Sequence, residues 1–320
     1  MTRPDGTIGV LLPRDIPLTD VVPFAQEADA HGFAELWVVE DLGYRGGLAQ
    51  AATVLARTRR IRVGVGLLPA AARNVAFTAM EAATLAQLHP GRVDIAVGHG
   101  MPGWMRSVGA WPRSPLTLLR EYIQTLRTLL AGEPAAVDGR YVRLDGLRLD
   151  RSALPSRAPD VLAGVRGPKS LAVSGEVADG TLLAEPVTPE YARQALGSIA
   201  PRRPHRLTAY NVAVVHDDPH TARTAARPAL QALGDPDWAP HIAPLGFRDE
   251  LAALRRASGG AREFAQAMPA QWVDRLALAG TPDQVRARIR HLFEAGVTGV
   301  VLAPVGPDHR SALAALARVL

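Results

Sequence analysis

Groups that can do chemistry follow several short apolar runs of this sequence. Glu40 and Asp41 come directly after the run Leu36–Val39, and Tyr44 and the pair Gly46-Gly47 follow them. Two adjacent carboxylates beside an aromatic ring suit a loop that binds a ligand or moves a proton. A solvated turn leading into the next helix would have a similar composition, so both interpretations stay open.

Glycines interrupt the next apolar run, Ile61–Leu68, at Gly64 and Gly66. Glycine inside a strand marks a bulge or a close approach of another group. A backbone bulge at Gly66 and Leu67 could support the flat face of an aromatic ring. Taken by themselves, these glycines favour the simpler explanation, a packing requirement inside the barrel.

A third glycine-rich segment runs from Gly98 through His99 and Gly100 to Trp104 and matches the pattern G-x-G-x-x-G. A dinucleotide site would need an acid ending a second strand about 20 residues later. Glu121 lies inside a helical pattern instead, which argues against that site. We favour a wall of a cofactor and substrate site, where His99 could donate a hydrogen bond or a proton. A histidine that caps a turn is an equal alternative.

The segment Gly164–Ser170 has the composition of an anion site. Gly167 followed by Pro168 predicts the start of a helix. The free N–H groups of a first helical turn attract anions, and Arg166 and Lys169 lie beside them. We therefore favour a phosphate site over an ordinary helix start. Lys169 is the only lysine among 36 basic residues, so any lysine Schiff base would have to use it.

Several other chemistries are disfavoured. The chain has no cysteine, which excludes disulfides, thiolate catalysis and cysteine-based zinc sites. His216 and His220 have H-x-x-x-H spacing, but Pro219 between them predicts a helix start that leaves His216 outside. H-E-x-x-H and G-x-S-x-G are absent. We expect no metal site.

The net charge of +5 raises the question of anionic partners. The densest arginine clusters, 59–62 and 202–206, read as solvated surface, so we expect no nucleic-acid partner. No uncharged apolar run reaches the roughly 20 residues of a membrane helix, and Met1–Leu12 lacks the pattern of a signal peptide. A cytoplasmic protein without a membrane partner is the default expectation.

These candidate loops must be held by a regular framework of strands and helices. The expected strands are Ile8–Leu12, Leu36–Val39, Ile61–Leu68, Val93–Val97, Val161–Ala163, Thr181–Ala184, Leu207–Val215 and Val297–Leu302. The expected helices between and after them are Asp20–His31, Leu48–Thr58, Asn74–Leu88, Leu116–Leu130, Pro168–Val177, Pro189–Ile199, Pro219–Leu233 (broken at Pro228), Thr281–Ala295 and Ser311–Val319.

The strand runs are continuously apolar, which is typical of parallel strands buried on both faces. Eight such units predict one α/β domain, a (β/α)8 or TIM barrel over residues 1–320, with function on the loops after the strands. Insertions are expected near 133–159, after the fourth strand, and near 235–270, after the seventh. Residues 137–144 of the first read as a small hairpin.

The ordered set of motifs resembles the bacterial luciferase-like superfamily. Within it the chain resembles the coenzyme F420-dependent oxidoreductases of the methylenetetrahydromethanopterin reductase-like branch. The resemblance runs along nearly the whole chain, and its strongest pieces are Leu36–Asp41, Ile61–Pro69, Pro90-Gly91-Arg92, Gly98-His99-Gly100, Ala163–Lys169 and Ala178-Asp179-Gly180.

The resemblance implies a flavin-type ring at the C-terminal mouth of the barrel, held by a small set of backbone features. It implies a non-proline cis peptide bond at Gly66–Leu67 behind the ring. It also implies that Gly98 to Gly100 border the ribityl chain, and that Gly167, Pro168 and Lys169 bind the cofactor phosphate. Arg166 beside them completes the expected cofactor site.

The expected reaction is hydride transfer between F420 and a small organic substrate, with the protein supplying orientation and proton management. Asp41 or Glu40 is the first candidate for acid–base work and His99 the second. Several F420 enzymes have histidine at the position of Asp41, which leaves the proton-handling residue open. Trp104, Tyr44 and the segment 235–270 are expected to shape the substrate pocket. A homodimer is expected from fold-level analogy.

Three alternatives remain at this stage. An FMN-dependent monooxygenase would use the same barrel and phosphate site, and the absorption spectrum of the bound cofactor would distinguish it. A non-redox phosphate-binding barrel, such as an isomerase or aldolase, would make Lys169 the candidate catalyst. A ligand-binding barrel without catalysis would keep the site but show no turnover.

Overall fold

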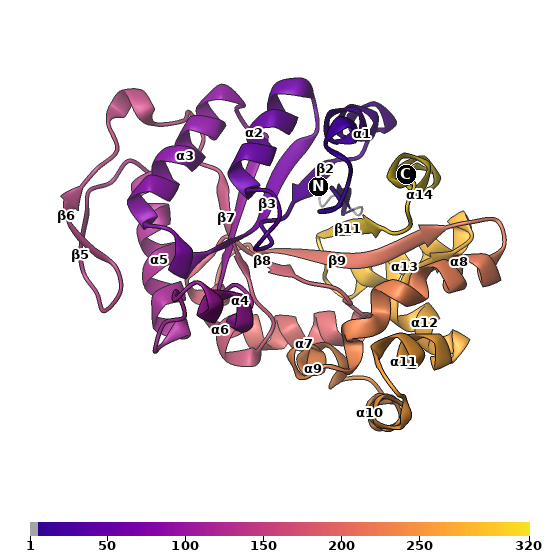
Figure 1. The fold of residues 1–320 in the computed structure, drawn as a ribbon. Coiled ribbons are helices and arrows are strands. Elements are labelled where there is room, and N and C mark those ends of the chain that lie inside the picture. Colours follow the sequence, from indigo (N-terminus) through magenta and orange to yellow (C-terminus); the bar gives the residue numbers. More distant parts are fainter. Residues whose placement is uncertain (1–5) are drawn as a thin grey trace.

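The structure is a computed structural model that describes residues 6–320, and its centre is a closed barrel of eight parallel strands (Figure 1). The barrel strands are β1 (Thr7–Leu11), β2 (Glu35–Val38), β3 (Arg62–Pro69), β4 (Val93–Gly98), β7 (Asp160–Gly164), β8 (Gly180–Leu183), β9 (Arg206–Val215) and β11 (Gly299–Pro304). They pair in the order β11-β1-β2-β3-β4-β7-β8-β9, and a further β9–β11 pairing closes the ring. All eight expected strands are present, which confirms the barrel.

Helices between successive strands cover the outside of the barrel. They are α1 (Leu18–His31), α2 (Gly47–Arg57), α3 (Val75–Leu88), α4 (Pro102–Ser107), α5 (Pro115–Leu130), α6 (Pro168–Val177), α7 (Pro189–Ile199), α8 (Pro219–Ala226), α13 (Pro282–Glu294) and α14 (His309–Ala317). Short 3-10 turns η1 (Ala70–Ala72) and η2 (Arg151–Ala153) lie in the connections. The expected helix at Pro219–Leu233 ends at Ala226, and the 3-10 helix η3 (Arg227–Gly234) follows, because Pro228 cannot continue the α-helix.

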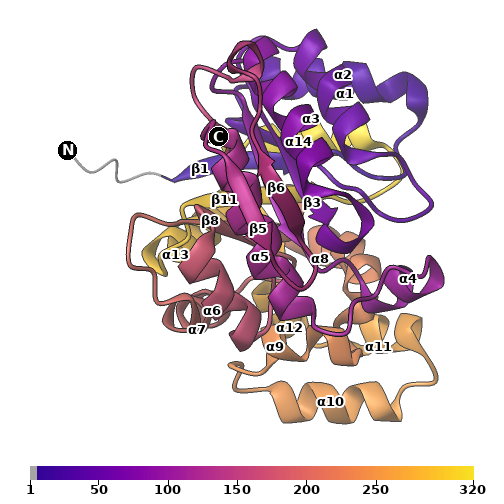
Figure 2. The same cartoon turned by 90° about the vertical axis from the view of Figure 1, so that its left-hand side faces the viewer.

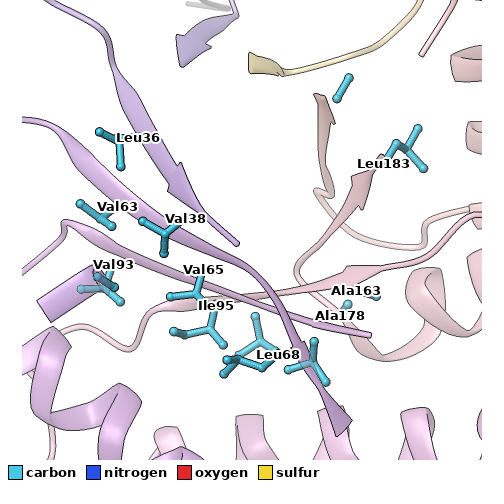
Figure 3. Close-up of a cluster of buried hydrophobic side chains, with 14 of the residues drawn as sticks. Leu36, Val38, Val63, Val65, Leu68, Val93, Ile95, Ala163, Ala178 and Leu183 are labelled. Carbon is cyan, nitrogen blue, oxygen red and sulfur yellow. The ribbon is translucent and has the colours of Figure 1, made fainter. Parts of the chain in front are cut away.

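Alternating residues of each strand build two apolar layers. One set points outward to the helices, and Figure 3 shows part of it, including Leu36, Val38, Val63 and Val65. The other set fills the barrel interior, where Trp37 and its neighbours form a separate cluster. Burial on both faces explains why the strand sequences are continuously apolar rather than alternating.

The N-terminal end of the barrel is closed by a buried network of charges. Arg206 on β9 lies 3.0 Å from Asp94, 2.8 Å from Asp160 and 3.2 Å from Glu35, measured between guanidinium nitrogens and carboxylate oxygens. Arg62 lies 2.5 Å from Asp94 on its other side. Asp94 and Glu35 are 0% and 2% exposed, so these carboxylates depend on the arginines for compensation of their charge.

Residues 133–159 lie outside the helix α5 and contain a two-stranded antiparallel hairpin (Figure 1). Its strands are β5 (Ala135–Asp138) and β6 (Arg143–Leu147), which confirms the hairpin expected at residues 137–144. Glu121 on α5 accepts hydrogen bonds from the backbone N–H groups of Arg140, Tyr141 and Val142. Glu121 therefore anchors the hairpin turn to the barrel.

Residues 235–270 showed no clear period in the sequence, yet most of them are helical. The elements are η4 (Pro236–Trp238), α9 (Ala239–Ile242), α10 (Arg248–Ala257), α11 (Ala261–Ala267) and the start of α12 (Ala270–Leu276). Each is short, and their own apolar cluster with α8 and η3 holds them together. Figure 2 shows α10 at the outer edge of this layer. A short strand that we did not expect, β10 (Leu278–Gly280), then pairs with the end of β9.

No helix within residues 6–320 combines the length and apolarity needed to cross a bilayer.

Candidate active site

The barrel interior contains an aromatic pair. Trp37 of β2 and Tyr210 of β9 pack edge to face, with ring centroids 5.8 Å apart. Two glycines of β3 make room for them. A Cβ atom on Gly64 would lie 2.3 Å from the Trp37 ring, and one on Gly66 would lie 2.2 Å from the Tyr210 hydroxyl oxygen. The packing explanation for these glycines is therefore correct, and Gly66 also belongs to the bulge described next.

Above this pair, β3 bulges at the mouth of the barrel. The peptide bond Gly66–Leu67 is cis, as the resemblance implied. The register of β3 against β4 shifts between Val65 and Leu68. Leu67 is partly accessible and lies against the backbone of the neighbouring strand ends, since Cβ atoms on Gly98 and Gly164 would approach its Cδ2 to 2.7 and 2.5 Å. The result is an apolar shelf at the mouth, formed by Leu67 with Gly98 and Gly164.

Glu40, shortly after β2, binds groups of its own loop and of the loop after β3. Its Oε2 accepts a hydrogen bond of 2.7 Å from the backbone N–H of Gly47 at the start of α2. The same oxygen lies 2.5 Å from the Arg73 guanidinium. A carboxylate at a helix N-terminus is favourably placed, so Glu40 fixes the start of α2 and the loop after β3.

Asp41 forms an ion pair with Arg14 from the loop after β1, with 2.7 Å between Oδ2 and the guanidinium nitrogen. The Arg14 guanidinium also lies over the Tyr44 ring, 4.9 Å from its centroid. Hydrogen bonding to Asp41 is the largest effect on Arg14 and raises its pKa. Tyr44 is 52% exposed, so it lines the rim of the mouth rather than a closed pocket.

His99 and α6 form the opposite side of the shelf. His99 Nε2 lies 2.9 Å from the Ser170 hydroxyl, and burial lowers the pKa of His99. The helix α6 starts at Pro168 after Gly167, and no side chain caps its N-terminus. The amide groups of its first turn are therefore available to an anion. Lys169 in that turn is exposed.

Arg166 connects the mouth to the layer after β9. Its guanidinium donates a 2.9 Å hydrogen bond to the carbonyl of Asp237 and lies over the Trp238 ring, 5.0 Å from the centroid. Arg166 was expected beside the first turn of α6, and its guanidinium in fact binds η4. This contact brings residues 235–270 next to the site.

The glycine-rich segment after β4 leads into a short helix. Pro102 opens the short helix α4, which carries Trp104 in a partly exposed position. Gly100 has φ +70°, a left-handed conformation that favours glycine. Trp104 therefore lies on the short helix that follows β4 and is partly exposed there.

Sequence reasoning missed Glu185, which is the second residue after β8. The bond Glu185–Pro186 is cis. The Trp238 indole N–H donates to the Glu185 carbonyl at 3.0 Å, and His241 Nδ1 lies 3.0 Å from the Pro186 carbonyl. Burial raises the pKa of the Glu185 carboxyl. The sequence did contain a signal for Glu185, because this acid comes directly after the predicted strand Thr181–Ala184 and before a proline. Glu40 was chosen as a candidate for the same kind of position after a predicted strand.

A separate pocket of about 380 Å³ lies beside the barrel mouth, between η1, the start of α5 and the hairpin. Its lining includes Arg73, Trp111, Tyr141 and Arg143. Arg73 contributes to this pocket and to the Glu40 loop at once. No cluster of three or more histidine, aspartate or glutamate side chains within residues 6–320 is arranged to hold a metal ion.

Comparison with known proteins places this geometry among oxidoreductases. The model of the luciferase-like monooxygenase family matches residues 3–299. The chain is 28% identical to the 5,10-methylenetetrahydromethanopterin reductase of Methanolobus tindarius, over 96% of this chain and 97% of that protein.

Two solved structures share the fold. The coenzyme F420-dependent tetrahydromethanopterin reductase of Methanopyrus kandleri superposes with a TM-score of 0.84 at 22% identity, covering 99% of this chain and 98% of that chain. An F420-dependent secondary alcohol dehydrogenase, in complex with an F420-acetone adduct, superposes with a TM-score of 0.77 at 20% identity and the same coverage.

Proposed function

The chain belongs to the luciferase-like monooxygenase family, and from this premise we propose that it is an F420-dependent oxidoreductase acting on a small organic substrate. The observation that carries the proposal is the apolar shelf of Leu67, Gly98 and Gly164 next to the uncapped start of α6. A planar ring fits the shelf, and a phosphate on the same molecule fits the helix start. The relatives whose names include F420 support the deazaflavin over other ring cofactors.

The residues present fit this cofactor along its length. Gly66 and Leu67 would support the ring, and Gly98, His99 and Gly100 would border its side chain. The N–H groups after Gly167 and Pro168, together with Lys169, would bind the phosphate. When bound, the deazaflavin supplies or accepts a hydride at ring carbon C5. The protein binds and orients both reactants and excludes water from the shelf.

The substrate side of the mouth is formed by the loop after β2, by α4 and by η4. Tyr44 and Trp104 supply aromatic surface there, and Arg166 with Trp238 closes the side towards η4. The reacting group is a carbonyl or an imine in the reductive direction, because those carbons accept hydride. A secondary alcohol is the reduced form of such a carbonyl, and one structural neighbour is named a secondary alcohol dehydrogenase in complex with an F420-acetone adduct.

We also propose that residues 1–320 form one domain with additions at 133–159 and 235–270, and that two copies associate through α3. The exposed side chains Phe77, Met80 and Leu88 are 64%, 52% and 68% accessible and share one face of α3. Such a patch suits an interface. Light scattering should give a dimer mass, and Met80→Glu should give a monomer; a wild-type monomer would contradict the proposal. The cytoplasmic location stays a prediction.

Titration of the purified protein with F420 and with FMN, followed by fluorescence, tests the cofactor proposal. We expect micromolar binding of F420 and much weaker binding of FMN. Tight FMN binding with weak F420 binding would overturn the proposal and favour an oxygen-consuming monooxygenase. Binding of neither would favour a non-redox barrel.

A further inference from the structure

Glu185 lies opposite Asp41 across the mouth of the barrel. In the ring of strands, three strands separate β2 from β8 on either side, namely β3, β4 and β7 on one path and β9, β11 and β1 on the other. Asp41 follows β2 and Glu185 follows β8. Since parallel strands bring their C-terminal ends to one rim, the two carboxylates flank the shelf from opposite sides.

The environments of these two carboxylates differ. Asp41 has the Arg14 guanidinium 2.7 Å away. Within residues 6–320, the Glu185 carboxylate has no ion pair and accepts no hydrogen bond from another side chain. Its hydrogen bond is with its own backbone N–H group. The charged groups near it are Arg166, Asp41 and Arg14. Burial is the largest effect and raises the pKa of Glu185, and the negative charge of Asp41 acts in the same direction.

The backbone that carries Glu185 is tightly held. Trp238 donates to the Glu185 carbonyl and His241 to the Pro186 carbonyl. The next N–H group, of Val187, donates to the side-chain oxygen of Asn211 at 2.9 Å. A carboxyl group on a rigid backbone can keep one orientation towards a reacting atom, which general acid–base catalysis requires.

A second polar group below the mouth lacks a partner. The hydroxyl of Tyr210 is buried and makes no hydrogen bond in the described part of the chain. Glu185 is the largest charged influence on Tyr210 after burial itself. Because buried polar groups are nearly always satisfied in native proteins, this hydroxyl points to a ligand or a water molecule bound between Tyr210 and the mouth.

The other candidates for proton transfer are committed elsewhere. Glu40 holds Gly47 and Arg73, and His99 is bonded to Ser170 at the start of α6. Of the three carboxyl groups of Glu40, Asp41 and Glu185 within residues 6–320, Glu185 is the one whose carboxylate has no ion-pair or hydrogen-bond partner on another residue.

We propose that Glu185 is the general acid and base of the hydride-transfer reaction, while Asp41 holds Arg14 in the ion pair described above. The inference rests on the proposed function and deepens it. In the reductive direction the carbonyl or imine carbon gains the hydride, the π electrons move to oxygen or nitrogen, and that atom takes the proton from Glu185. The carboxylate is then reprotonated from water. In the oxidative direction Glu185 accepts the proton as the hydride leaves the carbon.

The first test detects the proton itself and needs no substrate. Infrared spectra of the protein with F420 bound are recorded across pH 5–9, and the C=O stretch of a protonated carboxylic acid is followed. We expect this band near neutral pH in wild type and in Asp41→Asn, and its loss in Glu185→Gln. Glu185→Asp should keep it with an altered titration. The readout is the difference between the wild-type and Glu185→Gln spectra, because Asp94 also has a raised pKa and can contribute to the band. A band that is absent in wild type, or that is equally strong in Glu185→Gln, overturns the proposal.

The second test separates this proposal from the cofactor proposal. Glu185→Gln should bind F420 within about threefold of wild type, because the residue does not contact the expected phosphate site. With a ketone or imine that wild type reduces, kcat should fall by about 100-fold or more, and Glu185→Asp should recover part of it with a shifted pH profile. Unchanged kcat in Glu185→Gln overturns the role of Glu185, whereas failure of wild type to bind F420 overturns the proposed function instead.

Discussion

Removing Arg206 should destabilise the barrel without altering its mouth. In Arg206→Met the carboxylates of Asp94, Asp160 and Glu35 lose the cation that lies 2.8–3.2 Å from them. Breaking a buried ion pair by removing one partner costs about 3–5 kcal/mol. With an unfolding entropy of about 2 cal/mol/K per residue, a chain of this size should melt about 5–8 °C lower.

The pH dependence of this loss gives a sharper test. Burial raises the pKa of Asp94, and Arg206 and Arg62 oppose that effect. Without Arg206 the folded-state pKa of Asp94 rises further above its unfolded value of about 4. Between the unfolded and the folded pKa, the folded protein holds a proton that the unfolded chain has lost. The free energy of unfolding therefore falls as the pH rises from the unfolded pKa to the folded pKa of Asp94. The variant should therefore lose more stability relative to wild type at pH 8 than at pH 5.

Differential scanning calorimetry at pH 5 and pH 8 measures both quantities. Arg202→Met is the matched control, because Arg202 is exposed in the loop before β9, and its melting temperature should change by less than about 1 °C. A loss of under 2 °C for Arg206→Met, or an equal loss at both pH values, would show that the network does not compensate buried charge as argued. F420 affinity measured well below the melting temperature should be unchanged, since the network lies at the far end of the barrel.

Three further predictions concern the mouth and its supports. Gly66→Ala should weaken F420 binding and lower the melting temperature, because the added Cβ would lie 2.2 Å from the Tyr210 hydroxyl; adding Tyr210→Phe should restore part of both. Burial lowers the pKa of His241 to about 3, whereas the pKa of an unfolded histidine is about 6.5. At pH 5 the unfolded chain binds a proton that the folded protein excludes, which lowers the free energy of unfolding by about 2 kcal/mol. Stability should therefore fall as pH drops below about 6.5, and urea unfolding of His241→Phe should show a smaller fall between pH 7 and pH 5. Lys169→Gln should weaken F420 binding about tenfold, and the difference should shrink in high salt.

Each of these predictions has a matched control. Gly103→Ala should be neutral because nothing lies within 4 Å of its Cβ position. His220→Phe changes an exposed histidine and should leave the acid response as in wild type, while Arg193→Gln removes an exposed cation from α7 and should leave F420 affinity unchanged. Equal effects in a variant and its control would refute the corresponding argument.

Most of the barrel was predictable because its strands and caps are local features. The capping box of Thr281 and Gln284 is present at the start of α13, and α6 and α7 begin and end where the proline and apolar patterns indicated. The helices after η3 were not predictable in this way. They are short and are separated by prolines such as Pro244 and Pro269. They are stabilised by packing on one another rather than by a repeating apolar face of their own.

The site was predictable only in part, because its partners are distant in sequence. Asp41 meets Arg14 from another loop, and Arg166 meets Trp238 from the layer after β9. The sequence therefore indicated which loops matter but not which carboxyl groups are already paired. Glu185 became a candidate only when closure of the barrel placed it opposite Asp41.

The position of Lys169 has a practical consequence for chemical labelling. It is the only lysine of the 320 residues, and it is exposed in the first turn of α6. Apart from the α-amino group, an amine-reactive reagent would modify the protein at this position alone. One added reagent mass would then measure how accessible this helix start is. Protection of the amine by a bound phosphate group would give site occupancy directly from an intact-mass spectrum, without a fluorescent cofactor or a known substrate.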